Sequence, residues 1–281
     1  MSGALRARAP GKVNLCLFVG EPRADGLHPL VSVVQALSLA DELTLEPAEG
    51  DADEVVCPGV EGPNLAGRAL RLFREATGWD APPQRLTIEK RIPIAAGMGG
   101  GSSDAAAALR LAARAAGTPV PPGLAMRLGA DVPSLLRPGR VLMTGAGEQV
   151  ERLPGPPPLG FLVLPVAAAL STPDVYREAD RLGLTRPHAE LAALDARVRA
   201  DPGAHLHNDL QDAARSLCPA IDAALSAAAG AGAGRALVSG SGPTVVALFA
   251  DPARARAATG AWPGAVAAEP VGEEWARVTP A

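Results

Sequence analysis

One stretch of the sequence concentrates glycine directly before a predicted helix. Four of the five residues from Gly97 to Gly101 are glycines, and two serines and Asp104 follow them. Glycine costs roughly 1 kcal/mol relative to alanine inside a helix, so this arrangement requires a compensating benefit. The first four N–H groups of a helix have no partner inside it, and the helix dipole makes that end electropositive. Glycines there let the backbone approach an anion closely, which predicts a polyphosphate-binding loop rather than a flexible turn without a ligand.

The spacing separates this loop from three common phosphate-binding motifs. A Walker loop needs Gly-Lys-Ser or Gly-Lys-Thr, and no lysine precedes Ser102. A Rossmann fingerprint follows the first strand of a parallel unit, whereas three predicted strands and a helix precede this loop. The protein-kinase loop lies in a hairpin and not before a helix. A serine at this position, Ser102 or Ser103, can cap the helix, contact phosphate or hold Mg²⁺ through its oxygen.

Longer motifs around the loop give a family resemblance. The segment IPIAAGMGGGSSDAAAAL (92–109) resembles the central motif of the galactokinase, homoserine kinase, mevalonate kinase and phosphomevalonate kinase (GHMP) superfamily. Three more segments follow the order of that superfamily, namely APGKVNLCLFVGEPRADGLHPL (9–30), LGADVPSLL (128–136) and SGSGPTVVALF (239–249). The resemblance extends over nearly the whole chain. It implies a two-domain α+β fold with a nucleotide-binding N-terminal domain and a smaller C-terminal α/β sandwich.

Two residues in these motifs can supply the chemistry of phosphoryl transfer. A kinase aligns a hydroxyl with a γ-phosphoryl group, and it gains from a carboxylate that takes the proton and from a neighbouring cation. Without the resemblance, Asp131 is predicted to be an ordinary acidic residue near the start of a helix, and Lys12 a solvated charge at the end of a strand. The resemblance implies instead that Lys12, in a K-x-N motif, and Asp131, in G-A-D-V-P, are catalytic. Lys90, the only other lysine, is expected to remain a surface charge beside Glu89.

The resemblance also implies an ATP site, with Mg²⁺ as the accompanying ion. Ser103 is a candidate contact for the metal, and the sequence identifies no carboxylate dedicated to it. The residues expected to bind ATP are Pro93, Ile94, Ala95, Ala96, Gly97, Met98, Gly99, Gly100, Gly101, Ser102 and Ser103.

The segment RADGLH (23–28) implies that the acceptor substrate carries a cytidyl group. In similar sequences it usually reads Asp-Gly-Tyr-His, where the histidine hydrogen-bonds to cytosine and the aromatic residue stacks on it. His28 matches this pattern, whereas Leu27 offers apolar contact without an aromatic face. The segment STPDVYREA resembles T-P-x-x-[F/Y] and implies that Thr172 and Tyr176 contact the substrate. Without the resemblance, Tyr176 is predicted to be a core residue of a helix.

Three further residues are expected to contact the substrate. Asn14 lies in the K-x-N motif, where the alternative is a polar residue on a strand face. Gly240 and Gly242 belong to the third superfamily motif, and a tight turn between two strands would also explain them.

Composition limits the class of protein and its partners. The 281 residues are 48% hydrophobic and 20% charged, which is typical of soluble globular proteins. The net charge of −4 lacks the positive excess that indicates binding to nucleic acid. The N-terminus lacks the apolar core of a signal peptide, and the longest apolar run (161–170) is too short to span a bilayer. Three scattered cysteines fit buried thiols in a reducing cytosol, and the four histidines lack metal-binding spacing. We therefore expect a cytoplasmic protein that binds neither nucleic acid nor membrane.

The predicted elements mix strands and helices without a regular βαβ rhythm, which indicates an α+β protein in two parts. The proline-rich segment LPGPPPLG (153–160) is the expected linker, which divides the chain into domains 1–155 and 156–281. Strands are expected at 13–20, 30–39, 41–47, 84–92 and 161–166, with a strand, glycine turn and strand at 235–250. Helices are expected at 64–78, after the glycine loop to Gly117, as two short pieces in 123–136, and at 173–182, 188–200, 209–229 and 252–260.

The resemblance implies ATP-dependent phosphorylation of the 2-hydroxyl of 4-diphosphocytidyl-2-C-methyl-D-erythritol in the non-mevalonate route to isoprenoids. A homoserine or mevalonate kinase is the nearest alternative, and the RADGLH segment argues against it. A non-catalytic nucleotide-binding protein on the same fold is the other alternative. The presence of both Lys12 and Asp131 argues against that reading.

Overall fold

The computed structural model describes residues 3–94 and 96–281, and these form two β-sheets with helices packed on them. The strands of the larger sheet are β1 (Leu5–Val19), β2 (Leu30–Pro47), β3 (Glu54–Val56), β4 (Gln84–Glu89), β5 (Arg140–Thr144), β6 (Gln149–Arg152), β8 (His207–Asn208) and β12 (Thr279–Pro280). The smaller sheet holds β7 (Gly160–Leu164), β9 (Arg235–Val238), β10 (Val245–Phe249) and β11 (Val266–Ala268). The α-helices are α1 (Leu65–Thr77), α2 (Gly100–Ala116), α3 (Val132–Leu136), α4 (Thr172–Leu182), α5 (His188–Ala200), α6 (Gln211–Leu217), α7 (Ala220–Gly230) and α8 (Pro252–Ala257).

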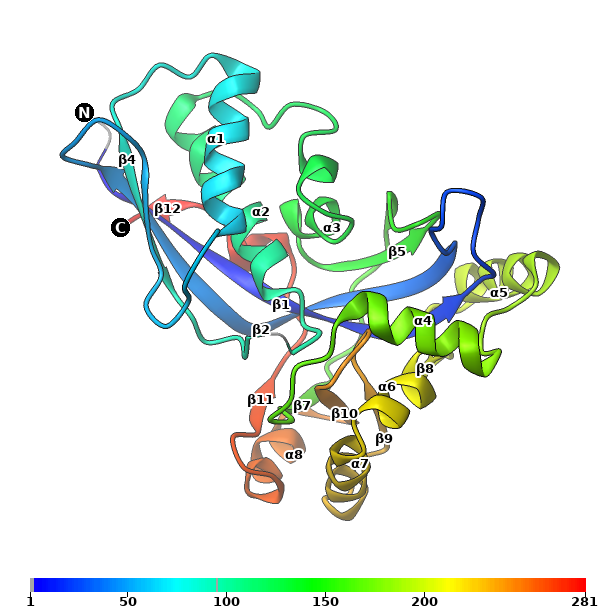
Figure 1. Ribbon diagram of the computed structural model, residues 1–281. Helices are drawn as coiled ribbons and strands as arrows, with labels where there is room; N and C mark the ends of the chain where they lie inside the picture. Colours follow the sequence, from blue (N-terminus) through cyan, green and yellow to red (C-terminus); the bar gives the residue numbers. More distant parts are fainter. Residues whose placement is uncertain (1–2, 95) are drawn as a thin grey trace.

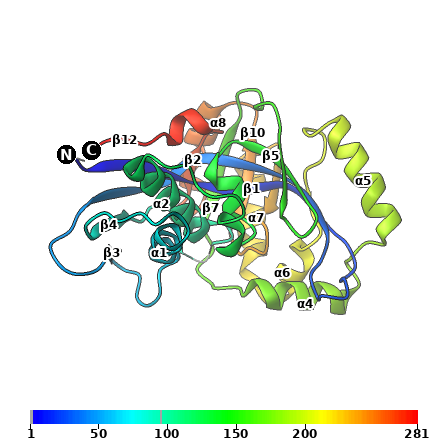
Figure 2. The ribbon, with the colours of Figure 1, turned by 90° about the horizontal axis from the view of Figure 1, so that it is seen from above.

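The long antiparallel pair of β1 and β2 connects the two halves of the molecule. In Figure 1 these strands cross the centre, with α1, α2 and α3 on one side and the four-stranded sheet with α7 and α8 on the other. The larger sheet has the path β12-β1-β2-β4-β3, and β8 and β12 join it from the C-terminal half. Figure 2 shows the two termini side by side, where β12 pairs with the start of β1. This mixed architecture of helices and sheets confirms the predicted α+β class.

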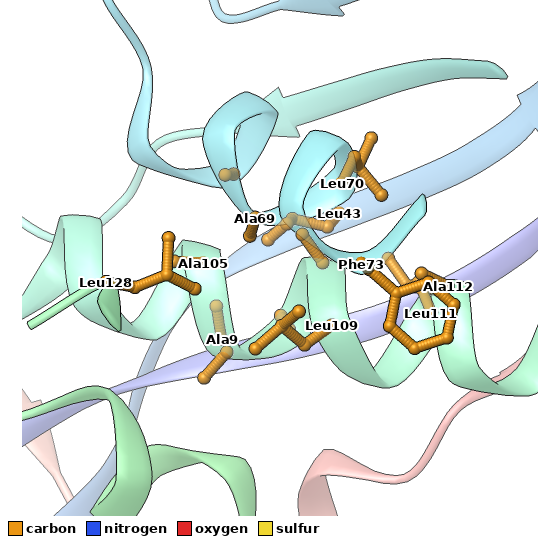
Figure 3. Packing of buried hydrophobic residues seen from close by; sticks show 14 of the residues in the cluster. Ala9, Leu43, Ala69, Leu70, Phe73, Ala105, Leu109, Leu111, Ala112 and Leu128 are labelled. Carbon is orange, nitrogen blue, oxygen red and sulfur yellow. The ribbon is translucent and has the colours of Figure 1, made fainter. Parts of the chain in front are cut away.

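Helices α1 and α2 cover the N-terminal half of the sheet and enclose a dry core with it. The alanines from Ala105 to Ala108 are fully buried, so α2 packs closely against its neighbours with little side-chain bulk between them. Phe73 of α1 is fully buried, and Figure 3 shows it packed beside α2 with Leu109 and Ala112 labelled nearby. This close packing holds the start of α2, and therefore the glycine loop, against the sheet.

The predicted strands differ from the observed ones in several places. Strand β1 starts at Leu5 rather than at residue 13, and the short strands β3, β8, β11 and β12 were not predicted. Strands expected at 30–39 and 41–47 are one strand, β2, because Asp41 is fully buried inside the sheet rather than in a turn. The hairpin of β5 and β6 was not predicted at all. Its strands have five and four residues, which is too short for a clear alternating pattern.

A further difference concerns the helix predicted at 209–229. The structure divides it into α6 and α7 at Cys218 and Pro219, and Pro219 becomes the residue that precedes α7. Proline lacks the N–H group that a continuous helix needs, so the chain ends one helix and starts another there. The predicted break at 123–136 is confirmed, since a 3₁₀ turn at Ala125–Arg127 precedes α3 and Pro133 lies in the first turn of α3.

We predict that Phe73→Ala lowers the free energy of unfolding by about 3–5 kcal/mol, because it removes a fully buried ring from a close-packed core. Chemical denaturation monitored by circular dichroism measures the loss. Leu182→Ala is the control, since this leucine of α4 is 40% exposed, and it should cost less than about 1 kcal/mol. Equal losses for the two variants would contradict the proposed core.

Candidate active site

The glycine loop leads directly into α2 and leaves its first N–H groups free. Gly99 caps the helix with φ of +65°, a left-handed conformation that glycine adopts easily, and no side chain caps this end. The first helical hydrogen bond runs from the Ser103 N–H to the Gly99 carbonyl. The N–H groups of Gly100, Gly101 and Ser102 precede it and have no helical partner. The serines therefore lie inside the first turn and do not cap the helix as the sequence suggested.

A cavity of about 410 Å³ opens over this loop. Of the residues expected to bind ATP, those that line it are Pro93, Ile94, Ala96, Gly97, Met98, Gly99, Gly100, Gly101 and Ser102. Ala95 lies outside the described residues. The opposite wall includes Cys57, Val60, Pro63, Asn64 and Leu65, from the start of α1 and the segment before it. We call this space the loop cavity.

Ser103 does not line the loop cavity. It is fully buried, and its hydroxyl donates a hydrogen bond of 2.7 Å to the carbonyl of Pro10. This serine joins α2 to β1, so its oxygen is not presented to a metal ion as the sequence suggested. The neighbouring Ser102 lines the loop cavity and the cavity beyond it.

Lys12 and Asp131 meet in a second cavity of about 350 Å³, on the other side of the loop. The Lys12 ammonium lies 3.5 Å from a carboxylate oxygen of Asp131, which immediately precedes α3. A side chain on Gly99 would lie 3.1 Å from Lys12 Cε and 3.7 Å from the Asp131 carboxylate, so the loop backbone approaches both groups closely. A carboxylate and an ammonium group thus lie beside the glycine loop. We call this space the transfer cavity.

A chain of hydrogen bonds fixes the position of the Lys12 ammonium. Lys12 Nζ donates to Asn14 Oδ1 at 3.0 Å, and Asn14 Nδ2 donates to the hydroxyl of Ser32 at 2.8 Å. That hydroxyl donates in turn to the carbonyl of Cys16. Lys12 is 6% exposed, so it is not the solvated charge at a strand end that the sequence alone favoured, and Asn14 beside it is 8% exposed.

The C-terminal half supplies the far wall of the transfer cavity. Gly240 lies so close to the site that a Cβ atom there would be 3.2 Å from Asn14 Oδ1 and 3.6 Å from Lys12 Nζ. Gly242 has φ of +76° and shapes the same turn, and the turn's Ser241 hydroxyl is 2.9 Å from that of Thr172. Thr172 begins α4, so this contact joins the helix to the glycine turn.

A third cavity of about 400 Å³ contains the residues expected to recognise a base. His28 Nδ1 is 2.9 Å from the carbonyl of Gly20, and its ring centre is 5.1 Å from that of Tyr176 at an angle of 46°. Burial, together with the nearby Asp131 carboxylate, raises the pKa of Tyr176 to about 12. Leu27 is 52% exposed and also lines this space. We call it the base cavity.

The three cavities follow one another in a row. The loop and transfer cavities share Gly97, Gly99 and Ser102. The transfer and base cavities share Leu30, Ala146, Thr172 and Tyr176. The row is continuous, so an extended ligand in the base cavity could reach the Lys12–Asp131 pair. A polyphosphate on the glycine loop would approach the same pair from the opposite side.

The structure corrects the prediction for Lys90. Its side chain is 14% exposed, and its ammonium contacts Asp41 at 2.5 Å and Asp104 at 2.7 Å. Burial lowers the pKa of Lys90, but the two carboxylates outweigh burial and the net shift is upward. Burial raises the pKa of Asp104 to about 7 against the opposing effect of Lys90, and nearby Asp41 adds to the rise. The only sequence signal was the rarity of lysine, because Asp41 lies 49 residues away in the chain.

Two features, a metal-binding cluster and a membrane-spanning helix, are absent from the described part of the chain. Within residues 3–94 and 96–281, no group of three or more His, Cys, Asp or Glu side chains is placed to hold a metal ion. No helix among these residues is long and apolar enough to cross a membrane.

Family models match two parts of the chain. The model described as GHMP kinases N terminal domain matches residues 64–136, and that described as GHMP kinases C terminal matches residues 191–268. The first match contains the glycine loop and Asp131, and the second contains the Gly240 turn.

Individual relatives narrow the family further. A 4-diphosphocytidyl-2-C-methyl-D-erythritol kinase of Kineococcus radiotolerans is 42% identical, covering 90% of this chain and 84% of that protein. The protein of the same name from Streptomyces coelicolor is 41% identical, covering 88% of both chains.

Solved structures agree with the sequence relatives. The crystal structure of a 4-(cytidine 5'-diphospho)-2C-methyl-D-erythritol kinase superposes with a TM-score of 0.76 at 36% identity, covering 94% of this chain and 98% of that chain. A homoserine kinase from Cytophaga hutchinsonii shares the fold, with a TM-score of 0.66 at 19% identity, covering 99% and 98%. The chain belongs to the GHMP kinases and, within them, to the family of 4-diphosphocytidyl-2-C-methyl-D-erythritol kinases.

Proposed function

We propose that this protein transfers the γ-phosphoryl group of ATP to the 2-hydroxyl of 4-diphosphocytidyl-2-C-methyl-D-erythritol. The observation that carries the proposal is the position of the Lys12–Asp131 pair, between the glycine loop and the cavity of His28 and Tyr176. ATP with its phosphates on the loop and an acceptor with its base beside His28 would meet at this pair. Kinship with enzymes named for this acceptor favours it over homoserine or mevalonate.

Each part of the site has a separate role in the proposed reaction. The free N–H groups before the first helical bond of α2 hold the phosphate oxygens, and α2 presents its electropositive end to them. The acceptor oxygen bonds to the γ-phosphorus, the bond from that phosphorus to the bridging oxygen of ADP breaks, and the hydroxyl proton moves to Asp131. Lys12 stabilises the negative charge that spreads over the transferring group. Asn14 and Ser32 hold the Lys12 ammonium in position for this task.

Mg²⁺ is proposed to accompany the nucleotide. This ion usually binds through one or two carboxylates together with substrate phosphates, so the lack of a three-residue cluster among the described residues is compatible with it. Among the residues with side-chain oxygens that line the transfer cavity, Ser102 lies in the first turn of α2 and Asp131 lies close to Gly99. When bound, the ion would neutralise charge on the phosphates.

We also propose that residues 1–155 and 156–281 form two domains and that the protein is cytosolic. Under this division the loop cavity belongs entirely to the first domain. The base cavity draws Gly26 to Leu30 from the first domain and Thr172 to Asp180 from the second. The acceptor would therefore bind between the two parts.

The experiment that tests the function is ADP release from ATP with four mixtures: the cytidyl acceptor, homoserine, mevalonate and no acceptor. We expect rapid release with the cytidyl acceptor only. Release with homoserine or mevalonate at a similar rate would assign a different acceptor. ATP binding without release in any mixture would support a non-catalytic protein.

We predict that Asp131→Asn and Lys12→Ala each lower kcat by about a hundredfold or more, because general-base and charge-stabilising groups contribute this much. ATP binding, measured by calorimetry, should persist in the Asp131→Asn protein, since the loop is unchanged. A turnover close to that of the wild type in the Asp131→Asn protein would exclude Asp131 as the base.

In the base cavity, we predict that Tyr176→Ala raises the KM of the acceptor strongly, because stacking on a base contributes roughly 1–3 kcal/mol. Leu27→Tyr should lower this KM or leave it unchanged, since it adds an aromatic face to the cavity. His28→Ala should reduce discrimination between the cytidine and uridine forms of the acceptor. Steady-state kinetics with both forms measures these effects. Unchanged kinetics in Tyr176→Ala would return this residue to a purely structural role.

A further inference from the structure

The glycine loop has an ionic cluster at its base that the reaction itself does not use. Lys90 lies just before the loop and Asp104 lies just after it, in α2. Their contact of 2.7 Å therefore joins the two ends of the segment across its opening. Asp41, in the middle of β2, anchors this pair to the sheet.

Both oxygens of the Asp41 carboxylate are occupied. Oδ2 accepts from the Lys90 ammonium at 2.5 Å, and Oδ1 accepts from the N–H groups of Arg91 and Ile92 at 2.5 and 2.8 Å. Asp41 is fully buried and is not among the residues that line the loop cavity. Any influence of Asp41 on a nucleotide there must pass through the loop or through Lys90, which lines the cavity together with Asp104.

The loop depends on such attachments for its shape. Gly97 and Gly99 have φ of +69° and +65°, and glycines give the chain little stiffness of its own. On its far side, the Lys12 N–H donates to the Met98 carbonyl at 2.9 Å, and the Ser239 hydroxyl donates to the Gly97 carbonyl at 3.3 Å. The cluster of Asp41, Lys90 and Asp104 is the matching attachment at the near side.

We propose that Asp41, Lys90 and Asp104 form a clamp that holds the ends of the glycine loop at the spacing required to bind a nucleotide polyphosphate. Asp41 is thereby a positioning residue for nucleotide binding, and Asp104 combines this role with a place in the wall of the loop cavity. The inference rests on the proposed function only in assigning the loop to a nucleotide.

The two carboxylates differ in a way that makes the clamp testable. Asparagine at position 41 must present its NH₂ group either to the Lys90 ammonium or to the two backbone N–H groups, so one side faces donor against donor. Asp104 Oδ1 is buried without a hydrogen-bond partner among the described residues. Asparagine at position 104 can therefore keep its oxygen toward Lys90 and turn its NH₂ group to that unpaired side.

The experiment measures ADP affinity by calorimetry in four variants of the full chain. We expect Asp41→Asn and Asp104→Ala to raise the Kd for ADP about tenfold, the loss typical of a displaced binding group, and Asp104→Asn to stay within about twofold of the wild type. In turnover, the KM for ATP should rise with the Kd, while the KM for the acceptor stays unchanged.

The matched control is Asp53→Asn. Asp53 also accepts from a backbone N–H group, that of Gln84 at 2.8 Å, and pairs with Arg74, but it lies at the opposite end of β4. This variant should lose stability without any change in the Kd for ADP.

Three outcomes would overturn either the clamp or the assignment of the loop to a nucleotide. If Asp41→Asn and Asp104→Ala lower the melting temperature yet bind ADP as the Asp53→Asn control does, the cluster is only structural and the proposal falls. If Asp41→Asn fails to fold, the contrast between Asp104→Ala and Asp104→Asn carries the test, and equal affinities would overturn the clamp. A wild-type protein that does not bind ADP would instead refute the assignment of the loop to a nucleotide.

Discussion

The hydrogen bond from the Lys12 N–H to the Met98 carbonyl connects the central strand to the glycine loop, and the site is built around it. Strand β1 is paired with β2 on both sides of this point, but its register shifts between Pro10 and Lys12 and again between Asn14 and Cys16. Such irregularities free a backbone group from the ladder and redirect a side chain. Here the freed N–H group holds the loop, and the same residue presents its ammonium to Asp131.

The chain has little room for variation at this junction. A Cβ atom on Gly11 would lie 3.2 Å from the Leu39 carbonyl and 3.2 Å from the terminal methyl of Met98. A side chain there would press on the loop and on β2 together. Residues from both halves of the chain then complete the site, since Gly240 approaches Lys12 and Asn14 from the opposite side. The cavity around Lys12 and Asp131 is therefore complete only when α4 and the Gly240 turn pack against the β1–β2 pair.

The two lysines of this arginine-rich chain perform related physical tasks. Each places a compact ammonium group, 8% or 14% exposed at its side chain, against carboxylates at a side of the glycine loop. Lysine offers three donors around a single point charge, whereas arginine presents a broad planar fork. The compact ammonium of Lys90 contacts Asp41 and Asp104 at the same time. That of Lys12 contacts Asn14 and also faces Asp131.

Features that depend on neighbouring residues could be predicted from the sequence. The glycines before α2, the alanines that let it pack closely and the break at Gly129 act within a few residues, so their pattern predicted the loop, α2 and the short helix α3. The motifs of the resemblance added Lys12, Asp131 and the α+β class. Other features depended on residues far apart in the chain. The prediction for Lys90 was wrong because its partner Asp41 lies far away in the sequence, on β2. The prediction for Ser103 was wrong because its hydroxyl donates a hydrogen bond to the Pro10 carbonyl. Only tertiary structure decides such pairings, since a buried charge or hydroxyl takes its partner from whatever the fold brings beside it.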